Sequence, residues 1–351
     1  MKILVIQQKM IGDVLTSSIL FEALRQKYPN AQLDYLINEH TFPVVEHHPF
    51  IDNFIFFTKE AESSKLALLK LAKSIRKREY DVVIDVYSKL SSNLITAFSK
   101  AKIKISYYKY YSSLFYQHNI KRQQSTNGKS GLAIINRMQL LQPLGIEATS
   151  IKPKIYLTDS EISNSKQFLK KHQIDLNKQL FMISVLGSGE NKTYPFPYMA
   201  KVIDAIVEKT SAQILFNYIP KQETEAKAIL SLCHTETKKH IKFHVFGKSL
   251  RDFLAITHHC DAVIGNEGGA INMAKALNIN TFAIYSPWID KASWNLFEDE
   301  NNLSVHLKDY LPELYTKPEK EYKNEASALY QKFKPEMFID KIEDFLVSHQ
   351  N

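Results

Sequence analysis

The sequence predicts an α/β protein of two domains, each built on a doubly wound parallel sheet. At 351 residues the chain is long for one hydrophobic core, so two domains are favoured. Apolar runs without alternation are followed by stretches of helical periodicity, and this order repeats on both sides of residues 151–157. Strands that alternate with helices at this spacing are typical of parallel sheets covered on both faces.

The N-terminal domain is expected to span residues 1–152. Its predicted elements are strand Lys2–Gln7, helix Val14–Tyr28, strands Leu33–Ile37 and Phe54–Phe57, helix Lys65–Arg78 and strand Asp81–Val86. A tyrosine-rich stretch, Ile105–Gln117, then interrupts this rhythm, and the polar run Gln123–Gly131 is predicted to be a loop. Residues 151–157 read as the linker between the domains.

The second domain is expected at residues 153–334, with a more regular pattern. Its predicted strands are Leu180–Leu186, Gln213–Tyr218, Lys242–Phe246, Asp261–Gly265 and Thr281–Tyr285. Its predicted helices are Glu161–His172, Pro197–Lys209, Gln222–Leu232, Leu250–His258 and the one after Gly269. A final helix, Pro335–His349 within residues 335–351, is expected to pack back on the N-terminal domain.

The stretch Asp261–Pro287 reads as a complete strand, loop, helix and strand. Its loop contains Glu267, Gly268 and Gly269, and adjacent glycines let backbone approach a ligand closely. The following helix turns its free N–H groups and its positive dipole end toward that loop, which suits a diphosphate. A tight strand-to-helix turn with no ligand is the alternative interpretation.

The composition is that of an ordinary globular protein, with 44% hydrophobic and 23% charged residues. No apolar run approaches the roughly 20 residues that span a bilayer, and the N-terminus does not read as a signal peptide, so we expect a cytoplasmic protein. The two cysteines, Cys233 and Cys260, form neither a disulfide framework nor a metal-ligand pattern. Both are predicted to be reduced and buried.

The formal net charge of +8 is concentrated in one segment. Between Val86 and Ile146 there are nine basic residues and no Asp or Glu, whereas charges nearly balance elsewhere. Such a block indicates a polyanionic partner, which could be nucleic acid, an anionic membrane surface or a phosphorylated substrate. Its five tyrosines between Ile105 and Gln117 suit a surface that meets sugars or acyl chains as well as phosphates. The alternative is a tyrosine-rich strand pair with solvated lysines.

Two facing α/β domains are expected to bind ligands in the crevice at the carboxyl ends of their strands. In the first domain, Asp13 follows the first strand where a helix begins. It is either a helix cap or a general base held over the crevice. In the second domain, Ser188 and Lys192 lie in the loop before Pro195 and can meet a phosphate, while Glu223 or Glu225 can accept from ribose hydroxyls.

Several other site types are not indicated. The first strand is not followed by G-x-G-x-x-G, which weakens a nicotinamide dehydrogenase, and no G-x-x-x-x-G-K-[ST] loop occurs, which argues against a P-loop kinase or ATPase. Asp-x-Asp is absent, and the adjacent histidines make poor metal pairs. Without a metal, leaving-group charge falls to Lys192 and the helix terminus at Gly269.

Three stretches resemble glycosyltransferase family 9, the ADP-heptose:lipopolysaccharide heptosyltransferases. The first is the opening, KILVIQQKMIGDVLTSSILFEALRQKYPNAQLDYLI, since a Gly-Asp-Val follows the first strand in that family. The second is SVLGSGENKTYP, which resembles a loop ending in Lys-x-Trp-Pro, with Tyr194 in place of tryptophan. The third is GNEGGAINMAKALNINTFAIYSP, which resembles the family's donor-site helix and the strand after it. The similarity runs in order along nearly the whole chain.

The resemblance implies a GT-B architecture of two Rossmann-like domains, with the acceptor bound by the first and the nucleotide sugar, expected to be ADP-heptose, by the second. It implies an inverting, metal-independent transfer without a cofactor, in which Asp13 deprotonates the acceptor hydroxyl that attacks the anomeric carbon. The positions that match donor-binding residues are Ser188, Gly189, Lys192, Glu223, Lys248, Glu267, Gly268, Gly269 and Ala270. Ser188, Lys192 and residues 268–270 are expected at the diphosphate, Lys248 at the base, Glu223 at ribose and Glu267 at the donor sugar.

The acceptor implied by the resemblance is an anionic lipopolysaccharide core on lipid A, met at the inner face of the inner membrane. The cations expected to bind it come from the basic segment and are Lys89, Lys109, Lys121 and Arg122. The sequence departs from the family at the donor site, where Glu267 replaces a shorter carboxylate, Gly268 a hydroxyl residue and Asn272 a histidine. A different nucleotide sugar, or a binding protein without catalysis, is therefore an alternative. Nucleic-acid binding is not expected, because no recognition motif accompanies the basic segment.

Overall fold

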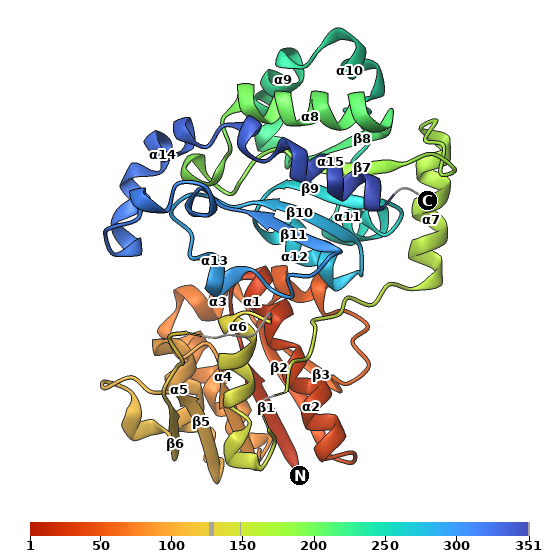
Figure 1. The fold of residues 1–351 in the computed structure, drawn as a ribbon. Helices are drawn as coiled ribbons and strands as arrows, with labels where there is room; N and C mark the ends of the chain where they lie inside the picture. Colours follow the sequence, from red (N-terminus) through yellow and green to blue (C-terminus); the bar gives the residue numbers. More distant parts are fainter. Residues whose placement is uncertain (126–129, 148, 350–351) are drawn as a thin grey trace. The chain divides into compact units, whose positions relative to one another are not determined.

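The chain forms two compact units, which divide after Tyr156. The computed structural model describes residues 1–125, 130–147 and 149–349, so part of the predicted loop Gln123–Gly131 lies outside the described residues. Each unit has its own parallel sheet with helices on both faces (Figure 1). The predicted α/β class with two parallel sheets is confirmed, and the division falls within residues 151–157, the predicted linker.

The first unit contains a six-stranded sheet in the order β3-β2-β1-β4-β5-β6, with every neighbouring pair parallel. Its strands are β1 (Lys2–Ile6), β2 (Gln32–Asn38), β3 (Asn53–Phe57), β4 (Val82–Asp85), β5 (Ile103–Tyr107) and β6 (His118–Ile120). Its α-helices are α1 (Ile11–Ser17), α2 (Ile19–Lys27), α3 (Lys59–Ser63), α4 (Lys65–Lys77), α5 (Leu90–Phe98) and α6 (Leu132–Gln139). Short 3-10 helices are η1 (Glu39–Val44), η2 (Ser113–Phe115) and η3 (Gln142–Leu144).

Two predicted features of this unit are revised. The helix predicted at Val14–Tyr28 begins earlier and is divided at Ser18, whose hydroxyl donates to the Leu15 carbonyl at 2.8 Å. Serine side chains that bond the preceding turn often bend helices. The tyrosine-rich stretch contributes to a parallel strand pair, β5 and β6, while its residues 108–116 form the connection between them.

The second unit contains a five-stranded parallel sheet in the order β11-β10-β9-β7-β8. Its strands are β7 (Leu180–Ser184), β8 (Gln213–Asn217), β9 (Ala262–Asn266), β10 (Asn280–Ile284) and β11 (Asn302–Val305). Its α-helices are α7 (Asp159–Lys171), α8 (Phe196–Thr210), α9 (Glu223–Leu232), α10 (Thr235–His240), α11 (Leu250–Thr257), α12 (Gly269–Ala276), α13 (Lys291–Trp294), α14 (Ala326–Lys332) and α15 (Ile339–Ser348). Its 3-10 helices are η4 (Glu190–Lys192), η5 (Pro220–Gln222), η6 (Leu307–Asp309), η7 (Pro312–Leu314), η8 (Glu319–Glu325) and η9 (Pro335–Met337).

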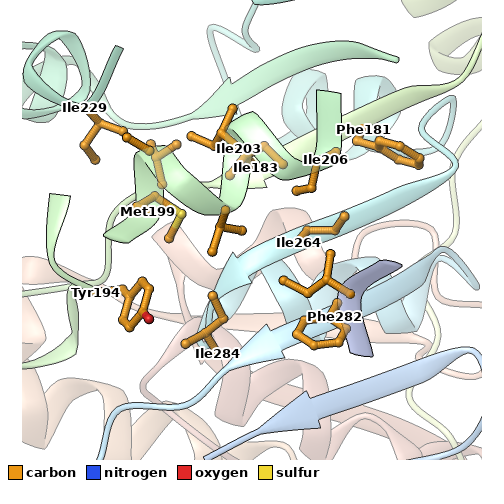
Figure 2. Packing of buried hydrophobic residues seen from close by; sticks show 14 of the residues in the cluster. Phe181, Ile183, Tyr194, Met199, Ile203, Ile206, Ile229, Ile264, Phe282 and Ile284 are labelled. Carbon is orange, nitrogen blue, oxygen red and sulfur yellow. The ribbon is translucent and has the colours of Figure 1, made fainter. Parts of the chain in front are cut away.

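The strands of this sheet are largely apolar because both faces are covered. Alternate residues enter opposite cores: Phe181 and Ile183 of β7 pack with α8, whereas Leu180 and Met182 pack with α7 and α11. Figure 2 shows the first of these cores, where Ile203 of α8 lies over the strands. A sheet enclosed in this way holds the loops at its strand ends in fixed positions.

The prediction of a strand at Lys242–Phe246 is wrong. Only Ile241 forms a bridge, to Ile214 of β8, and the chain then turns, since the Val245 N–H donates to the Lys242 carbonyl at 3.0 Å. Phe243 is buried against Tyr218, with ring centroids 5.0 Å apart. The alternating apolar residues that suggested a strand are thus buried by packing at the sheet edge instead.

The expected packing of the C-terminal helix on the first domain is corrected. Helix α15 contacts α8, and both helices belong to the second unit. Phe345 and Ile342 are buried in the same core as β10, with the rings of Phe282 and Phe345 5.7 Å apart. Its amphipathic face therefore completes the cover of the sheet that precedes it in the chain.

An ion pair between Glu161 and Arg251 joins α7 to α11. Glu161 accepts from Arg251 at 2.6 Å and also caps α7 through Thr158. The hydrogen bond from Arg251, reinforced by Thr158, lowers the pKa of Glu161 to about 2. Because this pKa is depressed in the folded state, the pair stabilises the unit above pH of about 4.5, and the stabilisation is lost as the pH falls toward about 2.

Replacing Glu161 by glutamine is expected to lower the free energy of unfolding at pH 7 by about 1.5–3 kcal/mol. The difference from wild type should narrow as the pH falls below about 4.5. Urea denaturation followed by tryptophan fluorescence reports on this unit, since Trp288 and Trp294 both lie in it. Glu236→Gln, which removes the exposed pair with Lys239, should change little. A wild-type to Glu161→Gln difference independent of pH would contradict the assignment.

Within the described ranges, no helix is both long enough and apolar enough to traverse a bilayer. Cys233 and Cys260 are unpaired and buried, as predicted. Burial raises the pKa of both thiols, that of Cys233 to about 12. Neither thiol is therefore expected to react readily at neutral pH.

Candidate active site

In the first unit, Asp13 lies just after the carboxyl end of β1, as the third residue of α1. Its Oδ1 accepts from the Nη2 of Arg137 at 2.6 Å, whereas its capping contact, from the Met10 N–H to Oδ2, is long at 3.4 Å. The side chain is 28% exposed, so solvent or a substrate can reach the carboxylate. Helix capping alone does not explain this residue.

Arg137 of α6 holds the Asp13 carboxylate in place, and sequence reasoning did not single it out as a site residue. Its side chain is 9% exposed, and its other donors reach Ser17 Oγ at 2.8 Å and the Ala133 carbonyl at 2.9 Å. A buried guanidinium needs such partners, and these leave it one orientation. The available signal was a lone arginine within the largely apolar helix LAIINRMQ.

The four cations predicted to bind an acceptor follow the carboxyl ends of three neighbouring strands. Lys89 follows β4, Lys109 follows β5, and Lys121 and Arg122 follow β6. Since β1, β4, β5 and β6 are adjacent in a parallel sheet, these cations share its edge with Asp13. The structure thus places the predicted acceptor residues on the same side of the first unit as the predicted base.

Tyr107 at the end of β5 links Asp13 to this cation group. The Arg122 guanidinium stacks 3.9 Å over the Tyr107 ring. Burial raises the pKa of Tyr107; the nearby charges of Arg137 and Arg122 oppose the rise, and that of Asp13 adds to it. Asp13, Arg137 and Arg122 therefore all lie close to one buried phenol.

A buried carboxylate, Asp85 of β4, supports the loops at this edge, and sequence reasoning did not select it. Its oxygens accept from the Ser88 N–H at 2.7 Å and the Tyr116 hydroxyl at 2.6 Å, and the Lys109 ammonium donates to the Ser88 carbonyl. Burial raises the pKa of Asp85 to about 6 against these hydrogen bonds, which lower it. Through Ser88, these hydrogen bonds hold the Lys109 ammonium in place at the carboxyl end of the sheet.

In the second unit, the loop between β9 and α12 is tied to β7. Asn266 is buried; its Oδ1 accepts from the Tyr194 N–H at 2.7 Å, and its Nδ2 donates to the Ser184 carbonyl at 2.9 Å. Gly268 caps α12 at φ 149° and ψ −156°, a conformation that side chains rarely allow. This geometry presents the first N–H groups of α12, at Gly269 and Ala270, which have no acceptor within the helix.

Replacing Gly268 by alanine is expected to destabilise the second unit by about 1–3 kcal/mol, because its backbone conformation is strained for any residue with a Cβ. A Cβ there meets no atom within 4 Å, so the cost is conformational rather than steric. Gly189→Ala is the matched control, since Gly189 is extended and its Cβ approaches only Asn191, at 3.7 Å. Urea denaturation monitored by tryptophan fluorescence compares them; equal stabilities would refute the strain.

Lys192 and Glu267, both predicted at the donor site, contact each other beside this loop. Their Nζ and Oε1 are 3.3 Å apart, and the Glu267 carboxylate is buried with no well-directed hydrogen bond to that oxygen. Lys192 also lies 5.6 Å from the centre of the Trp288 ring, and the Trp288 Nε1 donates to the Asn191 carbonyl at 2.9 Å. A buried carboxylate whose counter-ion is a half-buried lysine is a site prepared for a polar ligand.

Lys323 and Trp288 extend this group, and neither was predicted. Lys323 lies 5.5 Å from the centre of the same Trp288 ring. It also lines a pocket of about 890 Å³ within the second unit, at the carboxyl ends of β7 and β8. The lining includes the predicted Ser188 and Gly189, together with Asn191, Thr193, Lys221, Gln222, Glu225 and Ser327. The pocket therefore offers cations, hydroxyls and the carboxylates of Glu190 and Glu225.

Two predicted donor residues lie elsewhere. Glu223 begins α9, is half-buried and pairs with Lys227 at 2.7 Å, whereas Glu225 lines the pocket. Lys248 is exposed at a separate cavity of about 320 Å³ between α7 and α11, beside Arg251. Of the two carboxylates considered for ribose, the structure thus favours Glu225. In the described part of the chain, no three His, Cys, Asp or Glu residues gather as a metal site.

Comparison with known proteins identifies the family. The model of glycosyltransferase family 9 (heptosyltransferase) matches residues 68–322. Lipopolysaccharide heptosyltransferase 1 of Campylobacter coli is 22% identical over 299 residues, which cover 81% of this chain and 84% of that protein.

Two solved structures share the fold. The crystal structure of a family 9 glycosyl transferase from Veillonella parvula DSM 2008 superposes with a TM-score of 0.73 at 16% identity, covering 94% of this chain and 97% of that one. The E. coli ADP-heptose LPS heptosyltransferase II gives 0.69 at 18% identity, covering 95% and 99%. These matches confirm a GT-B-like fold, and the family match over more than half of the chain shows that this protein belongs to glycosyltransferase family 9, the heptosyltransferase family.

Proposed function

We propose that this glycosyltransferase moves a heptose, or a related sugar, from a nucleoside diphosphate sugar to the core of a lipopolysaccharide acceptor. The expected donor is ADP-heptose. The second unit binds the donor and the first unit binds the acceptor. Family membership supports this assignment, as do the names of relatives such as the lipopolysaccharide heptosyltransferase of C. coli.

The observation that carries the proposal is the Lys192–Glu267 pair beside the N-terminus of α12. A departing nucleoside diphosphate gains negative charge, which cations and free N–H groups stabilise. Lys192, Lys323 and the first turn of α12 supply these groups. The proposed transfer therefore needs no metal ion. Ser188 and Glu225 line the adjacent pocket and are assigned to the diphosphate and the ribose.

Asp13 is assigned as the general base. Its other oxygen, Oδ2, removes the proton from the acceptor hydroxyl as the hydroxyl oxygen attacks the anomeric carbon, and the bond to the nucleoside diphosphate breaks on the opposite face. The sugar configuration inverts, the proton resides on Asp13, and the electron pair leaves with the diphosphate. Arg137 keeps the carboxylate oriented toward the strand edge through its 2.6 Å contact.

The acceptor is assigned to the cationic edge of the first unit. Lys89, Lys109, Lys121 and Arg122 follow the strand ends next to Asp13, and their charge suits a phosphorylated core on a lipid. Such an acceptor places the reaction at the inner face of the inner membrane, with peripheral attachment of the enzyme.

Thermal denaturation across a panel of nucleotides and nucleotide sugars tests the donor assignment. A ligand at a hundred times its dissociation constant adds roughly 2.7 kcal/mol to the folded state. ADP and ADP-heptose are expected to raise the melting temperature. A rise with another nucleotide sugar alone would transfer the assignment to that sugar, consistent with the longer Glu267 carboxylate. If no nucleotide raises the melting temperature, the donor site is refuted.

A further inference from the structure

The connection between β5 and β6 exposes large apolar side chains that nothing in the first unit explains. Leu114 is 98% exposed and Tyr110 is 89% exposed, and Tyr108, Tyr111 and Phe115 are exposed as well. Isolated exposed apolar residues are common, but five within nine consecutive residues form a patch of the kind that marks an interaction site. We call residues 108–116 the aromatic loop.

The aromatic loop is held in shape by its own hydrogen bonds. The Asn119 amide donates to the Ser113 carbonyl at 3.0 Å and to the Tyr116 carbonyl at 3.1 Å, and the N–H of Ser112 donates to the Lys109 carbonyl at 3.1 Å. Tyr116 is buried and bonded to Asp85. The exposed side chains therefore project from an ordered backbone. Their exposure is not the result of a frayed segment.

Cationic side chains surround these aromatic rings. The ammonium of Lys109 lies 6.0 Å from the Tyr111 ring centre, and that of Lys121 lies 5.9 Å from the ring centre of Tyr108. No Asp or Glu occurs between Val86 and Ile146, so this surface carries no compensating negative charge from its own segment. Tyrosines and long cationic side chains together are typical of the boundary between lipid headgroups and acyl chains.

A neighbouring helix extends the same surface. Helix α5 contacts η2, which lies within the aromatic loop. Lys89 caps the N-terminus of α5 and Leu90 is its first residue, and both are exposed. Two elements that are separate in the sequence thus contribute the same pairing of a cation with an exposed apolar side chain. Because these lysines make the surface positively charged, an anionic bilayer surface fits it better than a neutral apolar partner does.

We propose that the aromatic loop docks the enzyme on a bilayer that contains anionic lipids, with Tyr110, Tyr111 and Leu114 entering the headgroup boundary. Lys109 and Lys121 bind the lipid phosphates beside them. The loop follows the carboxyl end of β5, at the sheet edge that carries Asp13, so docking brings a lipid-borne acceptor toward the base. This role deepens the proposed function and rests on it for the lipid nature of the acceptor.

Sedimentation with vesicles of phosphatidylcholine and phosphatidylglycerol tests the docking, using the full chain without donor or acceptor. Tyr110→Ser/Leu114→Asp is expected to weaken vesicle binding by about tenfold or more. Leu66→Asp is the matched control, because Leu66 on α4 is 73% exposed but lies outside the aromatic loop, and it should bind like wild type. Equal binding of the loop variant and wild type would overturn the proposal, as would absence of wild-type binding.

Insertion is measured directly with an environment-sensitive fluorophore on Leu114→Cys. The native thiols are buried with raised pKa values, so labelling should be selective. Anionic vesicles are expected to shift the emission of this label to the blue, whereas a label on Leu66→Cys should not respond. No shift at position 114 in the presence of vesicles, or the same shift with duplex DNA in their place, overturns lipid insertion.

The two proposals fail separately in these experiments. If the protein inserts the aromatic loop but transfers no sugar, the docking role stands and the proposed function is refuted. If the protein transfers sugar to a water-soluble core acceptor but does not bind vesicles, the proposed function stands and the docking role is refuted. Transfer to a vesicle-embedded acceptor should fall in the loop variant by the same factor as vesicle binding, with transfer to the soluble acceptor unchanged.

Discussion

Replacing Asp13 by asparagine is expected to lower kcat by on the order of 10²-fold or more, with little change in donor affinity. Asparagine keeps an oxygen that can accept from Arg137 but cannot take up the acceptor proton. The side chain is partly exposed, so folding should not be impaired. Initial-rate measurements at saturating donor and acceptor separate kcat from KM.

The matched control for this variant is Asp52→Asn. Asp52 accepts two hydrogen bonds from Arg25, at 2.8 and 2.9 Å, and it precedes β3, at the opposite sheet edge from Asp13. Its loss is expected to reduce the stability of the first unit without lowering kcat. If Asp13→Asn retains kcat within a factor of about three, Asp13 is not the general base and its role is limited to binding Arg137.

Replacing Lys192 by alanine is expected to weaken binding of ADP by about 10- to 100-fold, because a charge-assisted contact to the diphosphate is lost. Adenosine, which has no phosphate, should bind the variant and wild type equally. Isothermal titration with both ligands makes the comparison. A parallel loss of ADP and adenosine affinity would show that the variant damages the pocket rather than a phosphate contact.

The buried Glu267 carboxylate complicates the Lys192 variant, since it loses its counter-ion. Destabilisation is therefore expected alongside the binding defect. The double variant Lys192→Ala/Glu267→Gln should recover stability but not ADP affinity, which separates the two effects. Lys209→Ala is the surface control; it removes the exposed pair between Lys209 on α8 and Glu343 on α15 and should leave both properties unchanged.

The sequence predicted β1 to β4 and β7 to β10, because parallel strands covered on both faces are recognisable as apolar runs. It did not predict β11, and it offered β5 and β6 only as the alternative interpretation of the tyrosine-rich stretch. The stretch Asp261–Pro287 shows the agreement most clearly, since β9, α12 and β10 occur in the predicted order. The segment Lys242–Phe246 instead carries alternating apolar residues, and it lies at the edge of β8, where a single bridge forms at Ile241. Local pattern does not distinguish an edge turn from a strand, because the difference depends on which neighbours remain to pair.

The candidate site was predicted in part. Asp13, Lys192 and Glu267 were selected from motif positions, and the structure joins the last two directly. Arg137 was not recognised as the partner of Asp13, because the contact spans 124 positions of the chain. Trp288 was missed for the same reason, because its partner, the Asn191 carbonyl in the loop before α8, lies 97 positions earlier in the chain.

The C-terminal helix illustrates a limit of a different kind. Its amphipathic pattern correctly predicted a helix with one buried face, and α15 covers Ile339–Ser348. The sequence contained no information on which surface that face meets, since any apolar groove satisfies the same periodicity. In this chain the helix packs on α8.

A product assay measures whether the two units together catalyse sugar transfer. Wild-type enzyme is incubated with ADP-heptose and a deacylated lipopolysaccharide core that lacks heptose, and the products are analysed by mass spectrometry and nucleotide chromatography. We expect the acceptor to gain one heptose for each ADP released, with inverted anomeric configuration by NMR, and Asp13→Asn to abolish most of this turnover. ADP release without a heavier acceptor, or product with retained configuration, would contradict the proposed function.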